Sequence, residues 1–559
     1  MQVQSGVRKD HVLKKSVLGA HPIIQHFIEK LKISEIIGTY VNADKRRKVD
    51  TENILCLLIH NYLTSPTPLY EIQDWLKPLD IDSIGLFSHE TEFIYDERVA
   101  RALESFYACK HKEVFFHLAL RAIKIFELDC SQLHNDTTTI TFSGKYTHWN
   151  AREILTHGHN KDHRPDLKQL VLGLTVTADG AVPLLHDIYE GNKSDDQTHI
   201  SNHKQLQKLL SCTDFIYVAD SKLCTEQNLK KINQWGGRFV SVMPRTWKEN
   251  AQFRKAVISD LVQWKNLLSR PNSRLPKSRV DHYELAVGTY LTQQGYHLYW
   301  VKSSQKAGQD VETRMRKIDQ ALDELRLLQT KLNKYNLKTE SQIELKIQTI
   351  LKNNGCSRLI YYTIDSHKEY KNVYKKSGRP TTTARVTQES NMLYSISFSQ
   401  NIPEIEEDSK TDGIFPLITN LDPVAYSPKE VLEIYKFQPF LEKRHSQIKT
   451  YQQIAPIYLK DGKRSVAYLH MQVMALMVAS LIERTLRLGM KKRGIKTVSI
   501  YPEGRPCKSP TMFDIVRLFR NVERYEVTQS GTMAIYPAKL DKIHKEVLKL
   551  LEVPLSGYQ

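Results

Sequence analysis

The pattern of apolar and polar positions divides the chain into stretches with helical spacing and stretches that alternate like strands. From about residue 20 to residue 127, apolar residues recur three and four positions apart, as in HPIIQHFIEKL, and predict a helical module. From Leu133 the pattern becomes β, with LHNDTTTITF, LVLGLTVTA and AVPLLHDIYE, the last two joined by the turn at Asp179 and Gly180. We therefore expect three antiparallel strands, followed by a polar helix (HISNHKQLQKLL) and a short apolar strand (FIYVA) that ends on Asp220.

The order strand, strand, strand, helix, strand is typical of an RNase H-like core. Further strands are expected at GRFVSVMP, ELAVGTYL, GYHLYWVKS, SRLIYYTID, NMLYSISFS and GIFPLITN. Residues 311–352 predict an antiparallel helical hairpin with NKYNLKTES as its turn, and KEYKNVYKKSGRPTTTAR predicts a basic loop. Two helices are expected near the end, SPKEVLEIYKFQPFLEKRHSQIKT and VAYLHMQVMALMVASLIERTLRLGM. The second is apolar nearly all round, so it should be buried.

These elements predict an α/β fold in which an RNase H-like core, a mixed sheet flanked by helices, is interrupted by a large insertion. The 221 residues between Asp220 and Glu442 are far more than a simple connection needs. We expect five segments: an α-helical N-terminal domain with a hypothetical role in binding DNA ends (1–127), the first part of the core (128–244), a β-rich insertion with the helical hairpin (245–425), the second part of the core with the buried helix (426–530), and a C-terminal tail or helix (531–559).

Composition narrows the class of protein. Lys and Arg number 80 against 62 Asp and Glu, a formal net charge of +18, which favours a polyanionic partner such as nucleic acid. Charge alone leaves a solvated basic surface as an equal alternative. The seven cysteines are scattered and show neither a disulfide framework nor zinc spacing. We expect no secretory signal and no membrane association, because the apolar run Val473 to Ile482 is too short to span a bilayer. A bacterial cytoplasm or nucleoid is the expected location.

Two acids stand where the strand pattern gives no reason for a charge. Asp136 lies within a run of β-branched residues, and Asp220 ends an apolar strand. Alone, each is equally explained as a turn residue or a paired core acid. Two carboxylates in one small sheet repel unless a cation lies between them, and hard oxygen ligands suit Mg²⁺ or Mn²⁺.

A third acid is expected from a helix near the end of the chain. Its side chains at spacings of three, four and seven predict one shared helix face, formed by Tyr435, Gln438, Glu442 and Lys449. An ordinary amphipathic helix with a salt-bridged polar side explains the same spacing.

This helix resembles the Y-x2-R-x3-E-x6-K signature of bacterial transposases of the fourth insertion-sequence superfamily, with Gln438 where the family usually has Arg. Other segments resemble blocks of that family in the same order: DTTTITF, GHNKDHRPDLKQLVLGLTV, GNKSDDQT, VADSKL, KSGRP, DGIFPLITN and IAPIYLKDGKRSVAYLHMQVMALMVASLIERTLR. Together they cover most of residues 130 to 530, and the likeness is nearest to the branch called sixteen thirty-four.

The resemblance implies a DDE transposase that cleaves transposon ends and transfers the 3′-hydroxyl into target DNA. The implied catalytic and metal-binding residues are Asp136, Asp220 and Glu442, which would hold two Mg²⁺ ions, replaceable by Mn²⁺, about 3.5–4 Å apart. It further implies phosphate or backbone contacts from Lys449 and Tyr435, whereas the departure at Gln438 weakens such a contact there. The implied partners are the terminal inverted repeats and target DNA, with a homodimer in the synaptic complex.

Other basic residues are candidates for DNA backbone contacts, with solvated surface as the alternative for each: Arg164, Lys168 and Arg379. Two other functions remain open, an RNase H-like nuclease without strand transfer and a decayed DNA-binding protein. Ser221 has no paired His or Asp at a telling spacing, so it is not expected to be a nucleophile. The sequence also has no convincing set of Arg, His-x-x-Arg and Tyr, which a tyrosine recombinase requires.

Overall fold

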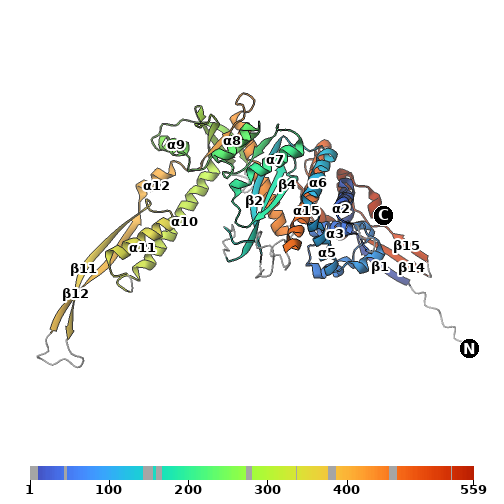
Figure 1. The fold of residues 1–559 in the computed structure, drawn as a ribbon, viewed down its shortest axis with the longest axis horizontal. Helices are drawn as coiled ribbons and strands as arrows, with labels where there is room; N and C mark the ends of the chain where they lie inside the picture. Colours follow the sequence, from blue (N-terminus) through green and yellow to red (C-terminus); the bar gives the residue numbers. More distant parts are fainter. Residues whose placement is uncertain are drawn as a thin grey trace, which may run out of the picture. The chain divides into compact units, whose positions relative to one another are not determined.

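The computed structural model describes residues 11–42, 47–142, 155–158, 166–271, 280–334, 337–374, 386–451, 462–529 and 532–559. The fold is mixed α/β (Figure 1), and its contacts divide the chain into two compact units. Unit 1 comprises Met1–Ser241, Asn420–Tyr426 and Glu430–Gln559, and unit 2 comprises Val242–Thr419 with Ser427–Lys429. The boundary predicted near residue 127 lies inside unit 1.

Unit 1 begins with the helical module expected from the apolar spacing, and this expectation is confirmed. Its helices are α1 (His21–Leu31), α2 (Ile33–Tyr40), α3 (Thr51–Thr64), α4 (Ile72–Leu76), α5 (Asp96–Ala108) and α6 (His111–Phe126). The sequence pattern missed a strand before them, β1 (His11–Val17), which pairs antiparallel with β14 (Glu523–Gln529), itself paired with β15 (Thr532–Tyr536). Segments near the two ends of the sequence thus share one small sheet, a pairing that no local pattern reveals.

The sheet strands of unit 1 follow the predicted order. β2 (Gln132–Phe142), β3 (Lys168–Thr177) and β4 (Pro183–Glu190) are an antiparallel meander, and β5 (Ile216–Val218) and β6 (Arg238–Val242) run parallel to β2. Their order in space is β4-β3-β2-β5-β6. Helices α7 (His199–Leu210) and α8 (Glu226–Gln234) connect β4 to β5 and β5 to β6. At the predicted turn between β3 and β4, Gly180 has φ +85°, a left-handed conformation that favours glycine.

A long apolar helix forms the centre of unit 1. α15 (Gly462–Lys492) packs against α1, α3, α5, α17 (Lys542–Leu551) and β4. It is long and apolar enough to cross a membrane, but 94% of its most apolar 18-residue window is buried within the protein, as in the core of a soluble fold. The buried helix predicted from its apolar circumference is therefore confirmed. α16 (Met512–Phe519) lies beside it.

The sequence also predicted one continuous helix over SPKEVLEIYKFQPFLEKRHSQIKT, and this prediction is wrong. The chain forms α13 (Pro428–Tyr435), then α14 (Gln438–Ser446), then a π-helical segment (Gln447–Tyr451). Pro439, in the first turn of α14, has no N–H to donate to the preceding turn, and proline disfavours helical backbone in the residue before it. The four side chains predicted to share one helix face therefore belong to three consecutive segments.

Unit 2 contains a second sheet region, ordered β13-β10-β8-β7 with β9 paired to β10. Its elements are α9 (Lys248–Ile258), β7 (Trp264–Pro271), β8 (Val280–Ala286), β9 (Tyr290–Leu291), β10 (His297–Ser303), α10 (Ser304–Gln329), α11 (Glu340–Asn353), β11 (Ile360–Tyr374), β12 (Val386–Gln400), α12 (Ile402–Ser409) and β13 (Ile414–Thr419).

The predicted helical hairpin of unit 2 is confirmed as α10 and α11, which pack together beside the two-stranded ribbon β11–β12 (Figure 1). Their common core includes Ile318, Leu325, Ile343, Ile347 and Ile396, each almost completely buried. The ribbon corrects one prediction: the first seven residues of the expected basic loop, KEYKNVY, are part of β11 and pair with β12. The polar composition of KEYKNVY predicted a loop, but the long partner strand β12 supplies backbone hydrogen bonds that hold this segment as a strand.

Candidate active site

Asp136 lies on β2, and Asp220 follows β5, the strand that pairs in parallel with the start of β2. The last paired residues of the two strands are His134 and Val218. Continuing this pairing by two residues would set Asp136 opposite Asp220, so we expect the two acids to lie near each other. The backbone N–H of Ala219 donates to Val240 O on β6 at 3.3 Å, which holds the residue before Asp220 against the sheet. Asp136 and Asp220 are both half-buried, so each carboxylate is partly solvated.

Local hydrogen bonds hold the backbone at both acids. Asp136 Oδ1 accepts from the N–H of Thr137 at 2.8 Å, and Asp220 Oδ1 accepts from the N–H of Lys222 at 2.9 Å. The hydroxyl of Ser241 on β6 donates to the carbonyl of Asp220 at 2.7 Å. Asp220 is thus held at the end of its strand from both the following turn and the next strand.

Helix α14 is joined to β2 by polar contacts on either side of Glu442. Gln438 Oε1 lies 3.1 Å from His134 Nδ1, and Gln438 Nε2 donates to Asn135 O at 3.4 Å. His445 follows Glu442 by three residues, and its Nδ1 lies 3.6 Å from Asp136 Oδ2. Glu442 is four residues after Gln438 and three before His445, so it shares their helix face. The carboxyl group, which is exposed, therefore lies on the side of α14 that meets β2.

Tyr435 connects all three predicted acids electrostatically. Burial raises the pKa of its hydroxyl, and the negative charges of Asp220, Glu442 and Asp136 raise it further. An electrostatic effect of this kind requires the three carboxylates to lie near one side chain. Although Tyr435 ends α13 rather than lying on the helix of Glu442, its hydroxyl lies within electrostatic reach of all three acids.

Gln438 and His134 have structural contacts at this site. Burial lowers the pKa of His134 to about 4, while its hydrogen bond with Gln438 opposes the shift, so the imidazole is neutral near pH 7. The amide of Gln438 is bonded to β2, where it holds α14 against the sheet.

The remaining predicted contact residues lie in different settings. Lys449 is half-buried in the π-helical segment that follows α14, and Lys168 is half-buried at the start of β3. Arg164 and Arg379 lie outside the described residues. Among the residues that the structure describes, no group of three or more His, Cys, Asp or Glu side chains is arranged as a ready metal-binding cluster.

Sequence reasoning missed a buried ion pair behind the site. Arg444, two residues after Glu442, donates through Nη1 to Glu483 Oε2 of α15 at 2.8 Å, with both side chains at most 3% exposed. The same guanidinium donates to Gly180 O at 2.8 Å and to Ala181 O at 3.0 Å. It therefore joins α14 to α15 and to the turn between β3 and β4. A signal was present in the sequence, since Glu483 interrupts an otherwise apolar helix.

Comparisons with known proteins add little to this geometry. Residues 13–120 match a family model described as a domain of unknown function, DUF4277. Seven chains of solved structures match. One is the piggyBac transposase synaptic complex with hairpin DNA, at 11% sequence identity and a TM-score of 0.29, over 52% of this chain and 63% of that one. The match thus spans less than two thirds of that transposase chain. No curated protein sequence matches. The site therefore rests on its own residues.

Proposed function

We propose that this chain is a DNA transposase in which Asp136, Asp220 and Glu442 are the catalytic acids of a DDE site. The observation that carries the proposal is the parallel pairing of β2 and β5, which ends two residues before Asp136 and two residues before Asp220, with Glu442 on the helix face that meets Asp136's strand. Each acid also raises the pKa of Tyr435. The resemblance of these segments, in order and spacing, to insertion-sequence transposases of the fourth superfamily supports the same assignment.

The order of strands supports an RNase H-like core. An antiparallel meander, β2–β3–β4, is followed through α7 by β5, which returns beside β2 and runs parallel to it. This arrangement brings the end of the fourth strand, which precedes Asp220, beside the first half of the first strand, which contains Asp136. Unit 2, inserted between β6 and α13, then separates these strands from the helix that carries Glu442.

The chemistry of the three side chains suits Mg²⁺ or Mn²⁺, because all three are carboxylates, the hard oxygen ligands that these ions prefer. Among the described residues they are not already gathered as a metal-binding cluster, so a bound cation would have to draw them together. A bound cation would also offset the repulsion between their like charges. Two bound Mg²⁺ ions would supply an activated water or 3′-hydroxyl and stabilise the departing 3′-oxygen.

The chain's own residues would orient the DNA in this mechanism. Asp136 and Asp220, fixed by the sheet, define one side of the site, and Glu442 closes it from α14. Lys449, on the segment that follows α14, would bind a phosphate beside the scissile bond, and Tyr435 would hydrogen-bond to the backbone. Lys168, Arg164 and Arg379 would contact the backbone further away. The proposed assembly is a dimer on two transposon ends in a bacterial cytoplasm.

The test compares three isosteric variants with one matched control. We expect Asp136→Asn, Asp220→Asn and Glu442→Gln each to lower Mg²⁺-dependent cleavage of the element's own flanking DNA by about 10³-fold or more, because each removes a charged ligand. Glu433→Gln changes an exposed acid on α13 and should retain activity. Full cleavage by any of the three variants would remove that residue from the site.

Two further measurements separate the proposal from its alternatives. A pre-cut transposon end incubated with a target plasmid should be joined to it by the wild type, whereas a nuclease without strand transfer would leave it unjoined. Calorimetric titration of Mn²⁺ should show binding that Asp136→Asn with Asp220→Asn abolishes. A decayed DNA-binding protein would bind DNA but show neither the joining nor this loss of metal binding.

A further inference from the structure

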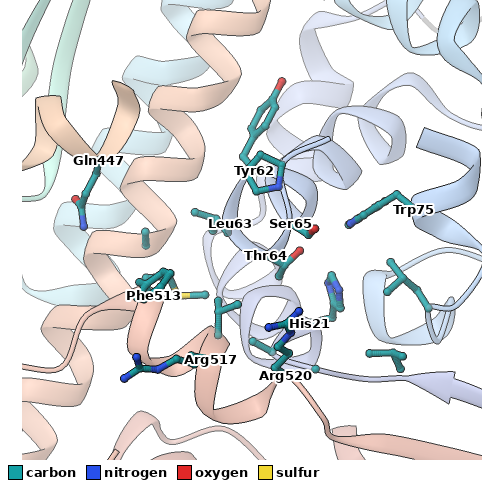
Figure 2. A pocket seen from close by; sticks show the side chains of 18 of the residues that line it. His21, Tyr62, Leu63, Thr64, Ser65, Trp75, Gln447, Phe513, Arg517 and Arg520 are labelled. Carbon is teal, nitrogen blue, oxygen red and sulfur yellow. The ribbon is translucent and has the colours of Figure 1, made fainter. Parts of the chain in front are cut away.

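Unit 1 contains a cavity of about 580 Å³ between the start of α1, the end of α3, α4 and the helices α15 and α16, and none of the proposed acids lines it. Figure 2 shows its labelled side chains. Apolar groups form most of its wall, among them Leu63, Trp75, Leu476, Phe513 and Val516. Its volume lies within the range of sites that hold small organic ligands.

The charged groups of this cavity have one sign. The ionisable side chains that line it, apart from the Tyr62 hydroxyl, are His21, Arg517 and Arg520, and none of its described lining residues is an acid. Burial lowers the pKa of His21 to about 4, so this imidazole is neutral near pH 7 and Nδ1 lies 3.2 Å from His60 Nδ1. The lining of the cavity therefore carries a formal charge of +2, contributed by Arg517 and Arg520.

Neither guanidinium is fully satisfied within the part of the chain that the structure describes. The Nε of Arg517 is buried and has no hydrogen-bond partner there, and the nearest acid, Asp514, is 3.8 Å from its Nη2. Its guanidinium lies 5.2 Å from the ring centroid of Tyr501 and 5.8 Å from that of Phe513, which hold it in place. Arg520 is exposed and has no carboxylate within salt-bridge distance among the described residues. The Nε atom of Arg517 is too enclosed for a ligand to reach, so an anion in the cavity would be held by the outer amino groups of Arg517 and Arg520.

We propose that this cavity binds a small organic anion that has an apolar body and an acidic head group. The apolar body would fill the space between Trp75, Leu476 and Val516, and the head group would accept hydrogen bonds from Arg517 and Arg520. The two positive charges of the described lining favour an anion over a cation, and the apolar wall disfavours inorganic phosphate alone. This site lies outside the proposed catalytic residues and does not depend on their assignment.

The cavity touches the segment that continues from the helix of Glu442. Gln447 and Thr450 of the π-helical segment line it. Gln447 also accepts a hydrogen bond from Arg444 Nη1 at 2.7 Å and donates to Glu483 Oε1 at 3.2 Å. A ligand in the cavity would therefore contact a residue of the polar network that holds α14.

The test uses two fluorescent probes with almost the same ring system. 1-Anilinonaphthalene-8-sulfonate carries the acidic group, and N-phenyl-1-naphthylamine lacks it. We expect the full chain to bind both at one saturable site. Arg520→Gln should weaken binding of the sulfonate probe by about fivefold or more, because the substitution removes a charge-assisted contact. It should leave the affinity for the neutral probe unchanged. Arg326→Gln, an exposed arginine of unit 2, is the matched control and should change neither.

A second variant tests the apolar part. Val516→Trp adds volume at a half-buried wall position and should abolish binding of both probes. Circular dichroism and the melting temperature of each variant check that the fold is retained. Absence of saturable binding, an equal loss of both probes in Arg520→Gln, or unchanged binding in Val516→Trp would overturn the proposal.

Discussion

The contacts inside unit 1 differ in kind from the contacts inside unit 2. The core of unit 2's hairpin and ribbon is made by residues 318–396, which lie close together in the sequence. Unit 1 is built from distant segments: β2 pairs with β5, α14 meets β2 from three hundred residues away, and β1 pairs with β14. The proposed chemistry lies in the unit assembled over long range. The acids thus depend on tertiary contacts, whereas the hairpin and ribbon of unit 2 follow from local pattern, although β10 of unit 2 pairs with β13 more than a hundred residues later.

The two units also differ in their buried polar groups. Every buried histidine among the described residues lies in unit 1, as does the buried pair of Arg444 and Glu483. Burial alone raises the pKa of Glu483, but Arg444 and Arg487 draw it below its ordinary value, so the carboxylate remains charged. The stability of unit 1 therefore depends on keeping its buried histidines neutral, whereas the buried charges of unit 2 include Asp281 and Asp412, the latter paired with Arg314.

Breaking the buried pair should have the largest effect. Arg444→Met leaves Glu483 charged, buried and without its closest partner, and it also removes the hydrogen bonds to Gly180 O and Ala181 O. We expect a loss of about 3–5 kcal/mol in the free energy of unfolding of unit 1. Denaturant titration measures the loss, and hydrogen exchange locates it. Arg101→Gln, which breaks an exposed pair with Glu97, is the control and should cost no more than about 0.5 kcal/mol. Equal costs for the two would contradict the role of burial.

Unit 2 should respond to apolar truncation without disturbing unit 1. Leu325 is completely buried between α10, α11 and the ribbon, so Leu325→Ala should cost about 2–5 kcal/mol through lost burial and a cavity. Faster amide exchange confined to residues 304–400 is the expected result. Leu327, on the same helix but 60% exposed, provides the matched control Leu327→Ala. Exchange that increased equally in unit 1 would show that the two units unfold together.

Acid should destabilise unit 1 before unit 2. Burial lowers the pKa of His134 and His199 to about 4 and that of His186 to about 3, whereas each is near 6.5 when unfolded. The unfolded chain then binds more protons, so stability is present above pH 6.5 and is lost as pH falls toward 4. The loss is on the order of 2 kcal/mol per histidine between pH 6.5 and pH 5. Hydrogen exchange at both pH values distinguishes the units, and earlier opening of unit 2 would argue against this account.

Local capping contacts should affect both units alike and only slightly. Thr225 caps α8 in unit 1 by accepting from the N–H of Asn228, and Ser303 caps α10 in unit 2 by accepting from that of Lys306, each at 3.2 Å. We expect Thr225→Ala and Ser303→Ala each to lower the unfolding free energy of its unit by about 1 kcal/mol. Thermal melts measure both. A cost several times larger in one unit would show that local contacts also differ between them.

Local pattern was sufficient for many elements and insufficient for the site. The polar helix at His199–Leu210 and the meander β2–β4 follow from residue spacing alone. The break before α14 was visible in Pro439 but was outweighed by the apparent helical spacing on either side. The parallel pairing of β2 with β5, which precedes Asp220, depends on a crossover of some eighty residues, which no window of sequence contains. The contact of Arg444 with Glu483 depends on how two helices pack, so Glu483 could be noticed but its partner could not.

The pairing of β1 with β14 has a consequence for the order of synthesis. β1 leaves the ribosome well before β14, because its partner strand follows more than five hundred residues later. At ordinary translation rates β1 waits roughly 25–100 s with an unpaired edge. Two adjacent lysines occupy its centre, a feature that discourages an open strand from pairing with other chains. Once β14 emerges, Lys14 meets Glu526 and Lys15 meets Glu523. The charges that keep the nascent strand soluble are thus the ones that select its partner.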